Sequence, residues 1–187
     1  MLTPLIHALK EWDIAVNALE KGQTILLLRK GGIREAGGHF KINYNPILLY
    51  PTYEHQKPDL LKSAYQTSVT PVPSGWHPDT IPIKSWANIT KVFQIQESVK
   101  VNLLLPYHIW TEKFAEERFN WQPGQPLFLL LLRVYLLPKP VLISYSDKYG
   151  GCRSWIQLNH SIILEGSQEV FNDADYDKKV AEIETIL

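Results

Sequence analysis

Six consecutive apolar residues, Leu127 to Leu132, run directly into Arg133 and limit the folds that are open to this chain. A helix needs about 20 apolar residues to cross a bilayer, so this run is too short for a transmembrane span. A short apolar run that follows a turn, here Pro123-Gly124, is typical of a buried strand. We therefore predict a buried strand over residues 127–136 and no membrane association.

Helical and strand-like patterns are mixed along the rest of the chain. Thr3 followed by Pro4 predicts a helix start, and Gly22 predicts its end. Between them an apolar stripe with helical spacing predicts one helix throughout; it comprises Leu5, Leu9, Trp12, Val16 and Leu19. Further helices are expected over residues 58–64, from Pro106 onwards and over 173–187. Strands are expected over residues 24–29, 39–43, 47–52, 91–96, 141–144, 155–158 and 161–164.

This order of elements does not alternate regularly between helix and strand. It predicts an α+β fold with a mainly antiparallel sheet, which can curl into a partly closed barrel, and with N-terminal, middle and C-terminal helices. The length of 187 residues fits a single domain over residues 1–187. Four prolines within residues 68–82 predict a surface loop. The acidic segment 173–187 predicts an amphipathic helix capped by Asp173 or Asp175.

Charge and cysteine content indicate a cytoplasmic protein. The formal net charge is zero, but residues 161–187 carry seven acidic residues and only two lysines. An acidic tail on a mildly basic body either masks an anion-binding face or keeps the protein soluble, and we favour solubility. Cys152 is the only cysteine, so no intrachain disulfide forms, and we expect this thiol to be buried. The N-terminus has no signal-peptide pattern.

The first stretch of interest is residues 29–35, where Arg29, Lys30 and Arg34 flank the glycine pair Gly31-Gly32. Glycines expose backbone N–H groups and the cations supply charge, so this arrangement suits a phosphate or a carboxylate. The spacing is neither that of a Walker loop nor that of a dinucleotide fingerprint. A solvated β-turn explains the same residues.

The second stretch, residues 50–56, follows a predicted strand and holds several kinds of polar group. His55 is a candidate general acid or base near neutral pH. Glu54 or Glu35 can pair with it or hold a divalent metal, although no recognised metal spacing is present. Thr52 and Gln56 are candidate ligand contacts. A capped turn between a strand and a helix is the structural alternative.

The third stretch is residues 149–155, in which another glycine pair, Gly150-Gly151, precedes Cys152 and Arg153. The planar guanidinium of Arg153 suits a phosphate or a carboxylate, and Trp155 is a candidate ligand contact. Cys152 would act as a nucleophile only beside a base that lowers its pKa.

These stretches, together with Ala8-Leu9-Lys10-Glu11-Trp12, resemble a bacterial family that is common in cyanobacteria, the domain of unknown function 1802. The resemblance covers nearly the whole chain, and the motifs are distinctive in combination. It implies a stand-alone intracellular domain and no assigned activity, so no catalytic residue is carried over. It supports the three stretches as the signature of the family and favours a shared pocket.

Three functions are compatible with the sequence. The first is a module that binds a phosphate-bearing ligand, either a nucleic acid or a nucleotide; its ligand-binding residues would be Arg29, Lys30, Gly31, Gly32, Arg34, Thr52, Gln56, Arg153 and Trp155. The second is a metal-dependent hydrolase or phosphodiesterase with His55 as base and Glu35 or Glu54 as metal ligand or partner. The third is a protein-interaction module that uses Trp76 and Trp86. The sequence identifies no cofactor and no oligomeric state.

Overall fold

A mixed sheet dominates the computed structural model, which describes residues 3–30 and 41–187. The strands follow the order β2-β5-β4-β3-β1-β6, with β7 paired to β5 outside this path. All described pairs are antiparallel except β1 with β3, which run parallel. The α+β prediction is confirmed, and the path of described strands ends at β2 and β6 without closing. The strands are β1 (Leu5–Trp12), β2 (Leu26–Arg29), β3 (Ile47–Thr52), β4 (Thr80–Ile95), β5 (Leu127–Ser144), β6 (Trp155–Ile162) and β7 (Gln168–Glu169).

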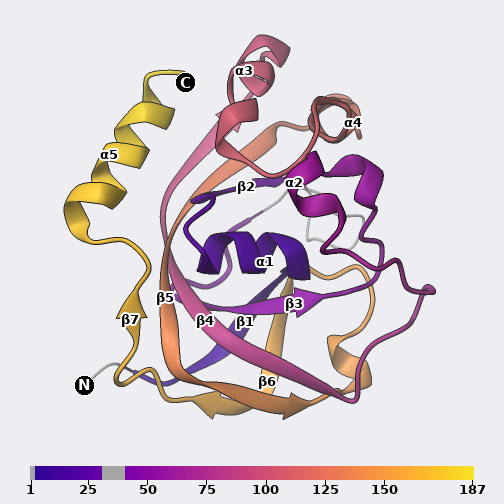
Figure 1. The fold of residues 1–187 in the computed structure, drawn as a ribbon, viewed down its shortest axis with the longest axis vertical. Coiled ribbons are helices and arrows are strands. Elements are labelled where there is room, and N and C mark those ends of the chain that lie inside the picture. Colours follow the sequence, from indigo (N-terminus) through magenta and orange to yellow (C-terminus); the bar gives the residue numbers. More distant parts are fainter. Residues whose placement is uncertain (1–2, 31–40) are drawn as a thin grey trace.

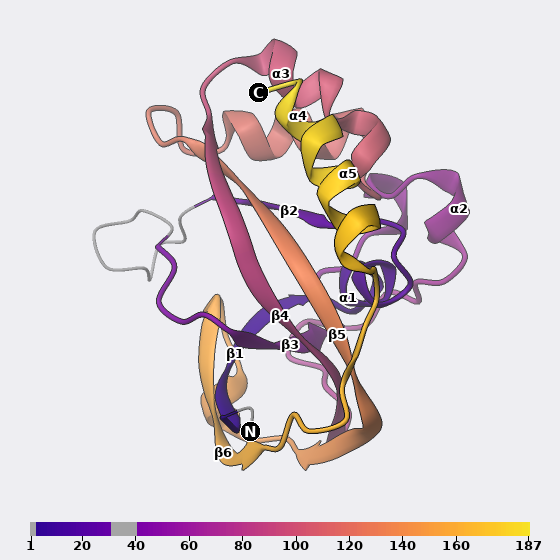
Figure 2. The ribbon, with the colours of Figure 1, turned by 90° about the vertical axis from the view of Figure 1, so that its left-hand side faces the viewer.

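The two long strands β4 and β5 form a twisted ribbon that runs along the molecule (Figure 2). Their register extends from Thr80 opposite Ser144 to Ile95 opposite Leu127, with one shift between Ile83 and Ser85 and another between Ile89 and Lys91. The apolar run 127–132 lies within β5. All of its leucines are fully buried, and Phe128 is half-buried. The prediction of a buried strand is confirmed.

The helices gather mainly at one end of this ribbon, where α3, α4 and α5 lie, whereas β6 lies at the opposite end (Figures 1 and 2). Helix α1 packs on the sheet between these ends and contributes its buried face to the largest apolar cluster. No helix within 3–30 and 41–187 combines the length and hydropathy needed to cross a membrane. The helices are α1 (Asp13–Glu20), α2 (Ser63–Gln66), α3 (Ser98–Leu103), α4 (Glu112–Asn120) and α5 (Asp173–Glu184), with single 3₁₀ turns at η2 (Pro58–Leu60), η3 (Leu105–Tyr107) and η4 (Asp147–Tyr149).

The predicted N-terminal helix is wrong in its first half, because residues 5–12 form β1. This strand lies between β3 and β6, so both of its edges are paired, and Ala8 and Leu9 are fully buried in apolar clusters on opposite faces. Pairing with two strands that are distant in sequence outweighs the local preference for helix. The end of the helix is as predicted: Gly22 has φ 66° and its N–H donates to Leu19 O, while Gln23 N–H donates to Ala18 O in a Schellman motif.

Smaller differences concern element boundaries. The predicted strand 39–43 is not observed at residues 41–43, and residues 39–40 lie outside the described part. The predicted loop 68–82 ends at residue 79, since β4 begins at Thr80. The C-terminal helix is capped by Asn172, whose side chain accepts from Asp175 N–H, rather than by an aspartate. Helix α4 begins only at Glu112, after a Thr111 cap, and not at Pro106.

Candidate functional site

A cavity of about 400 Å³ lies where several strand ends and the end of α4 meet. Strands β1 and β3 run parallel, so Trp12 and Thr52 are register partners and both strands deliver their last residues to the same place. Strand β2 also ends here, at Arg29, and β6 begins next to it at Trp155. The lining includes Lys10, Glu11, Trp12, Arg29, Lys30, Thr52, Glu54, His55, Arg118, Trp121, Gly151, Cys152, Arg153 and Ser154.

The cavity brings together residues from all three stretches that the sequence singled out. Arg29 and Lys30 come from the first, Thr52 and the Glu54-His55 pair from the second, and Arg153 from the third. Residues Gly31, Gly32, Arg34 and Glu35 lie outside the described part of the chain, so their roles stay predictions. The ligand and catalytic roles of all these side chains also stay predictions.

Two predicted contacts do not line the cavity. Gln56 is buried, and its side-chain oxygen accepts from Ile14 N–H at 3.0 Å while its amide donates to Tyr53 O. It therefore anchors the start of α1 to the segment after β3. Trp155 donates from its indole N–H to Lys41 O at 3.0 Å. Both side chains support the walls around the cavity.

Arg29 is paired with a carboxylate that the sequence analysis did not single out. Its Nη1 lies 2.8 Å from Glu11 Oε2 and 3.2 Å from Lys10 O, to both of which it donates. The side chains are only 15% exposed for Arg29 and 9% for Glu11. The second carboxylate oxygen of Glu11 accepts from Trp12 N–H. This ion pair ties β2 to β1 and neutralises one of the cations in the wall.

Lys10 holds the third stretch against β1. Its ammonium donates to Tyr149 O at 2.6 Å and to Gly151 O at 2.8 Å. Burial lowers the pKa of Lys10, whereas the charge of Glu54 opposes this shift. The contacts join residues that are about 140 positions apart, which no local pattern could show.

Lys30 is the most deeply buried cation of the lining. It is 6% exposed, its ammonium donates to Phe119 O, and it lies 5.8 Å from the centroid of the Phe119 ring. Among the described residues no carboxylate forms an ion pair with it. Burial lowers the pKa of Lys30, and the charge of Arg118 lowers it further. Such an ammonium is stabilised by any anion that approaches it.

Arg118 belongs to α4, and its guanidinium lies 5.1 Å from the centroid of the Phe114 ring. Burial lowers the pKa of Arg118, while Glu11 opposes the shift. Trp121 follows as the C-cap residue of α4 and is 40% exposed. The sequence analysis missed both as site residues, because a charged residue and an indole near a helix end usually face solvent or the core.

The turn at residues 150–153 places Gly151 and two exposed side chains, Cys152 and Arg153, at the cavity. Gly151 has φ 73°, and a Cβ on Gly150 would lie 2.8 Å from Tyr145 Oη. Cys152 is exposed, which corrects the expectation of a buried thiol. Arg153 is exposed as well, and no ion pair or hydrogen bond holds its guanidinium among the described residues.

The turn gives a direct stability prediction. Gly151→Ala should lower the free energy of unfolding by about 1 kcal/mol, because an alanine disfavours the left-handed backbone that glycine adopts here. Gly151→Asn should lose less, since asparagine tolerates this conformation. Chemical denaturation of the three proteins measures both effects, and equal losses for Ala and Asn would contradict the backbone explanation.

His55 lies at the cavity with its Nε2 3.5 Å from Glu54 Oε2, and it has a positive φ of 63°. A positive φ on a residue other than glycine is uncommon and gathers at functional sites. The metal hypothesis gains no support in the described part of the chain, where no group of three or more His, Cys, Asp or Glu side chains is arranged to hold an ion.

The sequence matches the family described as Domain of unknown function (DUF1802) over residues 8–182. The chain belongs to this family. The match spans every residue of the DUF1802 chain that lines the described cavity, from Lys10 to Ser154. No curated protein matches the sequence.

Solved structures of the ASCH protein from Zymomonas mobilis are similar to this DUF1802 chain over most of its length. One has 12% sequence identity and a TM-score of 0.46, and the alignment covers 94% of this chain and 93% of that chain. A single-residue variant of the same protein also has 12% identity and a TM-score of 0.46, with 94% of this chain and 96% of that chain covered.

Proposed function

We propose that the cavity binds a phosphate-bearing ligand, a nucleotide or a nucleic-acid strand. The observation that carries this proposal is its charge: five cations and only two carboxylates line the described wall. One carboxylate, Glu11, is already paired with Arg29. The other carboxylate of this described wall is Glu54, and the remaining cations are Lys10, Lys30, Arg118 and Arg153.

The shape and the aromatic content of the cavity also suit a nucleotide. A volume of about 400 Å³ lies within the range of small-ligand pockets. Trp121 offers an exposed indole face on which a base can stack, close to the cations that would hold a phosphate. Trp12 also lines the cavity, but its ring packs against Phe114 with centroids 5.6 Å apart. Trp121 is therefore our choice of stacking residue.

The test uses Arg153, because its exposed guanidinium can be removed without breaking a described contact. Arg153→Ala should weaken binding of labelled single-stranded RNA, DNA or nucleotides about tenfold at low salt, as expected for one lost charge-assisted hydrogen bond. Fluorescence anisotropy over a range of salt concentrations gives the affinities and the number of phosphates contacted.

Lys139→Ala is the matched control, since Lys139 is exposed, carries the same charge and lies outside the cavity. It should change the affinity less than twofold at moderate salt. Absence of binding to every one of these ligands at low salt would refute the proposed function. Equal losses in both variants would refute the cavity as the binding site.

A hydrolase is the second candidate function, and the strained backbone of His55 at the cavity favours it. A chromogenic phosphodiester with Mg²⁺ or Mn²⁺ tests this activity, and hydrolysis that survives His55→Ala would exclude His55 as the base. The protein-interaction hypothesis is less well supported, because Trp86 is 4% exposed and only Trp76, at 43%, offers its ring to a partner.

A further inference from the structure

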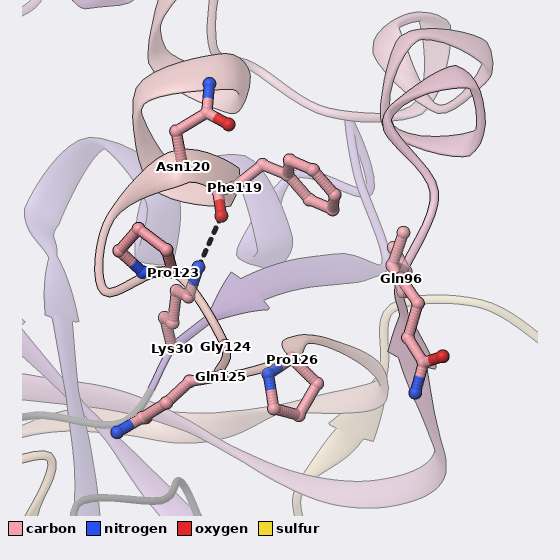
Figure 3. Close-up of a pocket in the computed structure, with 9 residues that line it drawn as sticks. Lys30, Gln96, Phe119, Asn120, Pro123, Gly124, Gln125 and Pro126 are labelled. Atoms are coloured by element: carbon pink, nitrogen blue, oxygen red, sulfur yellow. Dashed lines mark hydrogen bonds between the residues drawn. The ribbon is translucent and has the colours of Figure 1, made fainter.

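We infer that the ligand is a single-stranded oligonucleotide of at least two residues, which extends from this cavity into a second one beside it. This inference rests on the proposed function. The second cavity has a volume of about 420 Å³ and lies between the end of α4, the start of β5 and the end of β4 (Figure 3). It is as large as the first, so it has room for a further base.

The two cavities adjoin along a short piece of chain. Lys30 lines both of them. At the end of α4, Arg118 and Trp121 line the first cavity, and the intervening Phe119 and Asn120 line the second. Lys30 and the end of α4 therefore border both cavities, and the proposed ligand passes from one to the other along them.

Lys30 supplies the charge at this junction. Figure 3 shows its ammonium directed at Phe119 O, which is its described hydrogen-bond acceptor. An ammonium has three donors, and no carboxylate pairs with this one in the described structure. A phosphodiester between two nucleosides brings one negative charge and free acceptor oxygens to this point.

The chemistry of the second cavity differs from that of the first and suits a base. Lys30 is its only charged residue among the described ones, so it offers little to a second phosphate. Its wall combines the ring of Phe119 with the amides of Gln96, Asn120 and Gln125. The side-chain oxygen of Gln125 is buried and has no described hydrogen-bond partner. Amide groups pair with the donors and acceptors on base edges, and aromatic rings stack on their faces.

The experiment compares 5′-phosphorylated mononucleotides and dinucleotides carrying each of the four bases, as ribo- and deoxyribonucleotides, by isothermal titration. The best dinucleotide should bind about tenfold more tightly than the best mononucleotide, as expected for one additional stacked base. Gln125→Met should reduce this gain, since it removes an amide that pairs with the edge of the second base while the Phe119 ring remains. It should leave binding of a mononucleotide in the first cavity unchanged. The substitution is nearly isosteric and removes an oxygen without a described partner, so thermal unfolding should not change.

Asn120 lies at an exposed position in the same wall. Asn120→Ala should reduce the difference in affinity between dinucleotides and mononucleotides independently of Gln125. If mononucleotides bind as tightly as dinucleotides, the ligand does not extend into the second cavity, and the proposed function stays intact. A phosphoserine peptide that binds more tightly than every dinucleotide would overturn the extension as well. If neither nucleotides nor dinucleotides bind, the proposed function fails and the extension fails with it.

Discussion

Glu11→Gln should lower the free energy of unfolding by about 3 kcal/mol, the largest single effect that we expect from a conservative substitution in the cavity wall. The charged partners Glu11 and Arg29 lie 2.8 Å apart and are mostly buried. Removing the carboxylate charge takes the ion-pair partner at 2.8 Å away from a mostly buried guanidinium, in a region of low dielectric. Glutamine retains a side-chain oxygen that can accept from Trp12 N–H, so the loss reports mainly on the charge.

A double-mutant cycle separates the ion pair from the packing around it. Arg29→Met removes the partner charge and retains much of the side-chain volume. Glu11→Gln with Arg29→Met should recover at least half of the stability that Glu11→Gln alone loses, because both charges of the pair are then absent. Urea denaturation of the four proteins gives the coupling free energy. Additive losses would show that Glu11 and Arg29 act independently.

Acidification from pH 7 to pH 5 should reduce stability by about 2 kcal/mol through His108 alone. This residue is 3% exposed, and neither ring nitrogen has a hydrogen-bond partner among the described residues. Burial and, to a smaller extent, the Lys62 ammonium lower the pKa of His108 to about 3, while the backbone of Trp110 opposes the shift. The imidazole of His108 is therefore protonated below about pH 6.5 in the unfolded chain, whereas it stays neutral in the folded protein until the pH approaches 3.

The sign follows from this difference in bound protons. The stabilisation is fully present above pH 6.5 and is lost progressively as the pH falls towards 3, because only the unfolded state gains from protonation in that window. His108→Phe should flatten the dependence by about 2 kcal/mol between pH 7 and 5, whereas stability at pH 7 should change little. Denaturation curves at both pH values measure this difference, and parallel curves for the two proteins would contradict the role of His108.

The sequence predicted the parts of the fold that local chemistry determines. The apolar run 127–132 became a buried strand, and Gly22 ended α1 in the expected conformation. Residues 5–12 were predicted wrongly, since alanine, leucine, lysine and glutamate favour a helix locally. What makes them a strand is pairing with β3 and β6, which come about 40 and 150 positions later. That information is spread over the chain and appears in no local window.

The residues of the candidate site also divide into those that a local pattern indicates and those that only long-range contacts bring together. Arg29, His55 and Arg153 could be singled out because each stands in a polar stretch beside a strand or a glycine pair. Lys10 and Glu11 could not, since they had been assigned to the exposed side of a helix. Arg118 and Trp121 were missed for a related reason, because a charged residue and an indole near a helix end usually face solvent or the core. Only the folded structure, in which several strand ends meet the end of α4, shows that these four residues line the same cavity.

The clamp that Lys10 forms on residues 149–151 has a consequence for synthesis of the protein. Strand β1 depends on a turn that lies about 140 residues later in the chain, so the cavity cannot assemble before residues 149–151 have been synthesised. Until β6 arrives, one edge of β1 has no neighbour and the ammonium lacks its acceptors. A nascent chain that has not reached Ser154 therefore exposes an open strand edge to chaperones and cannot hold a ligand.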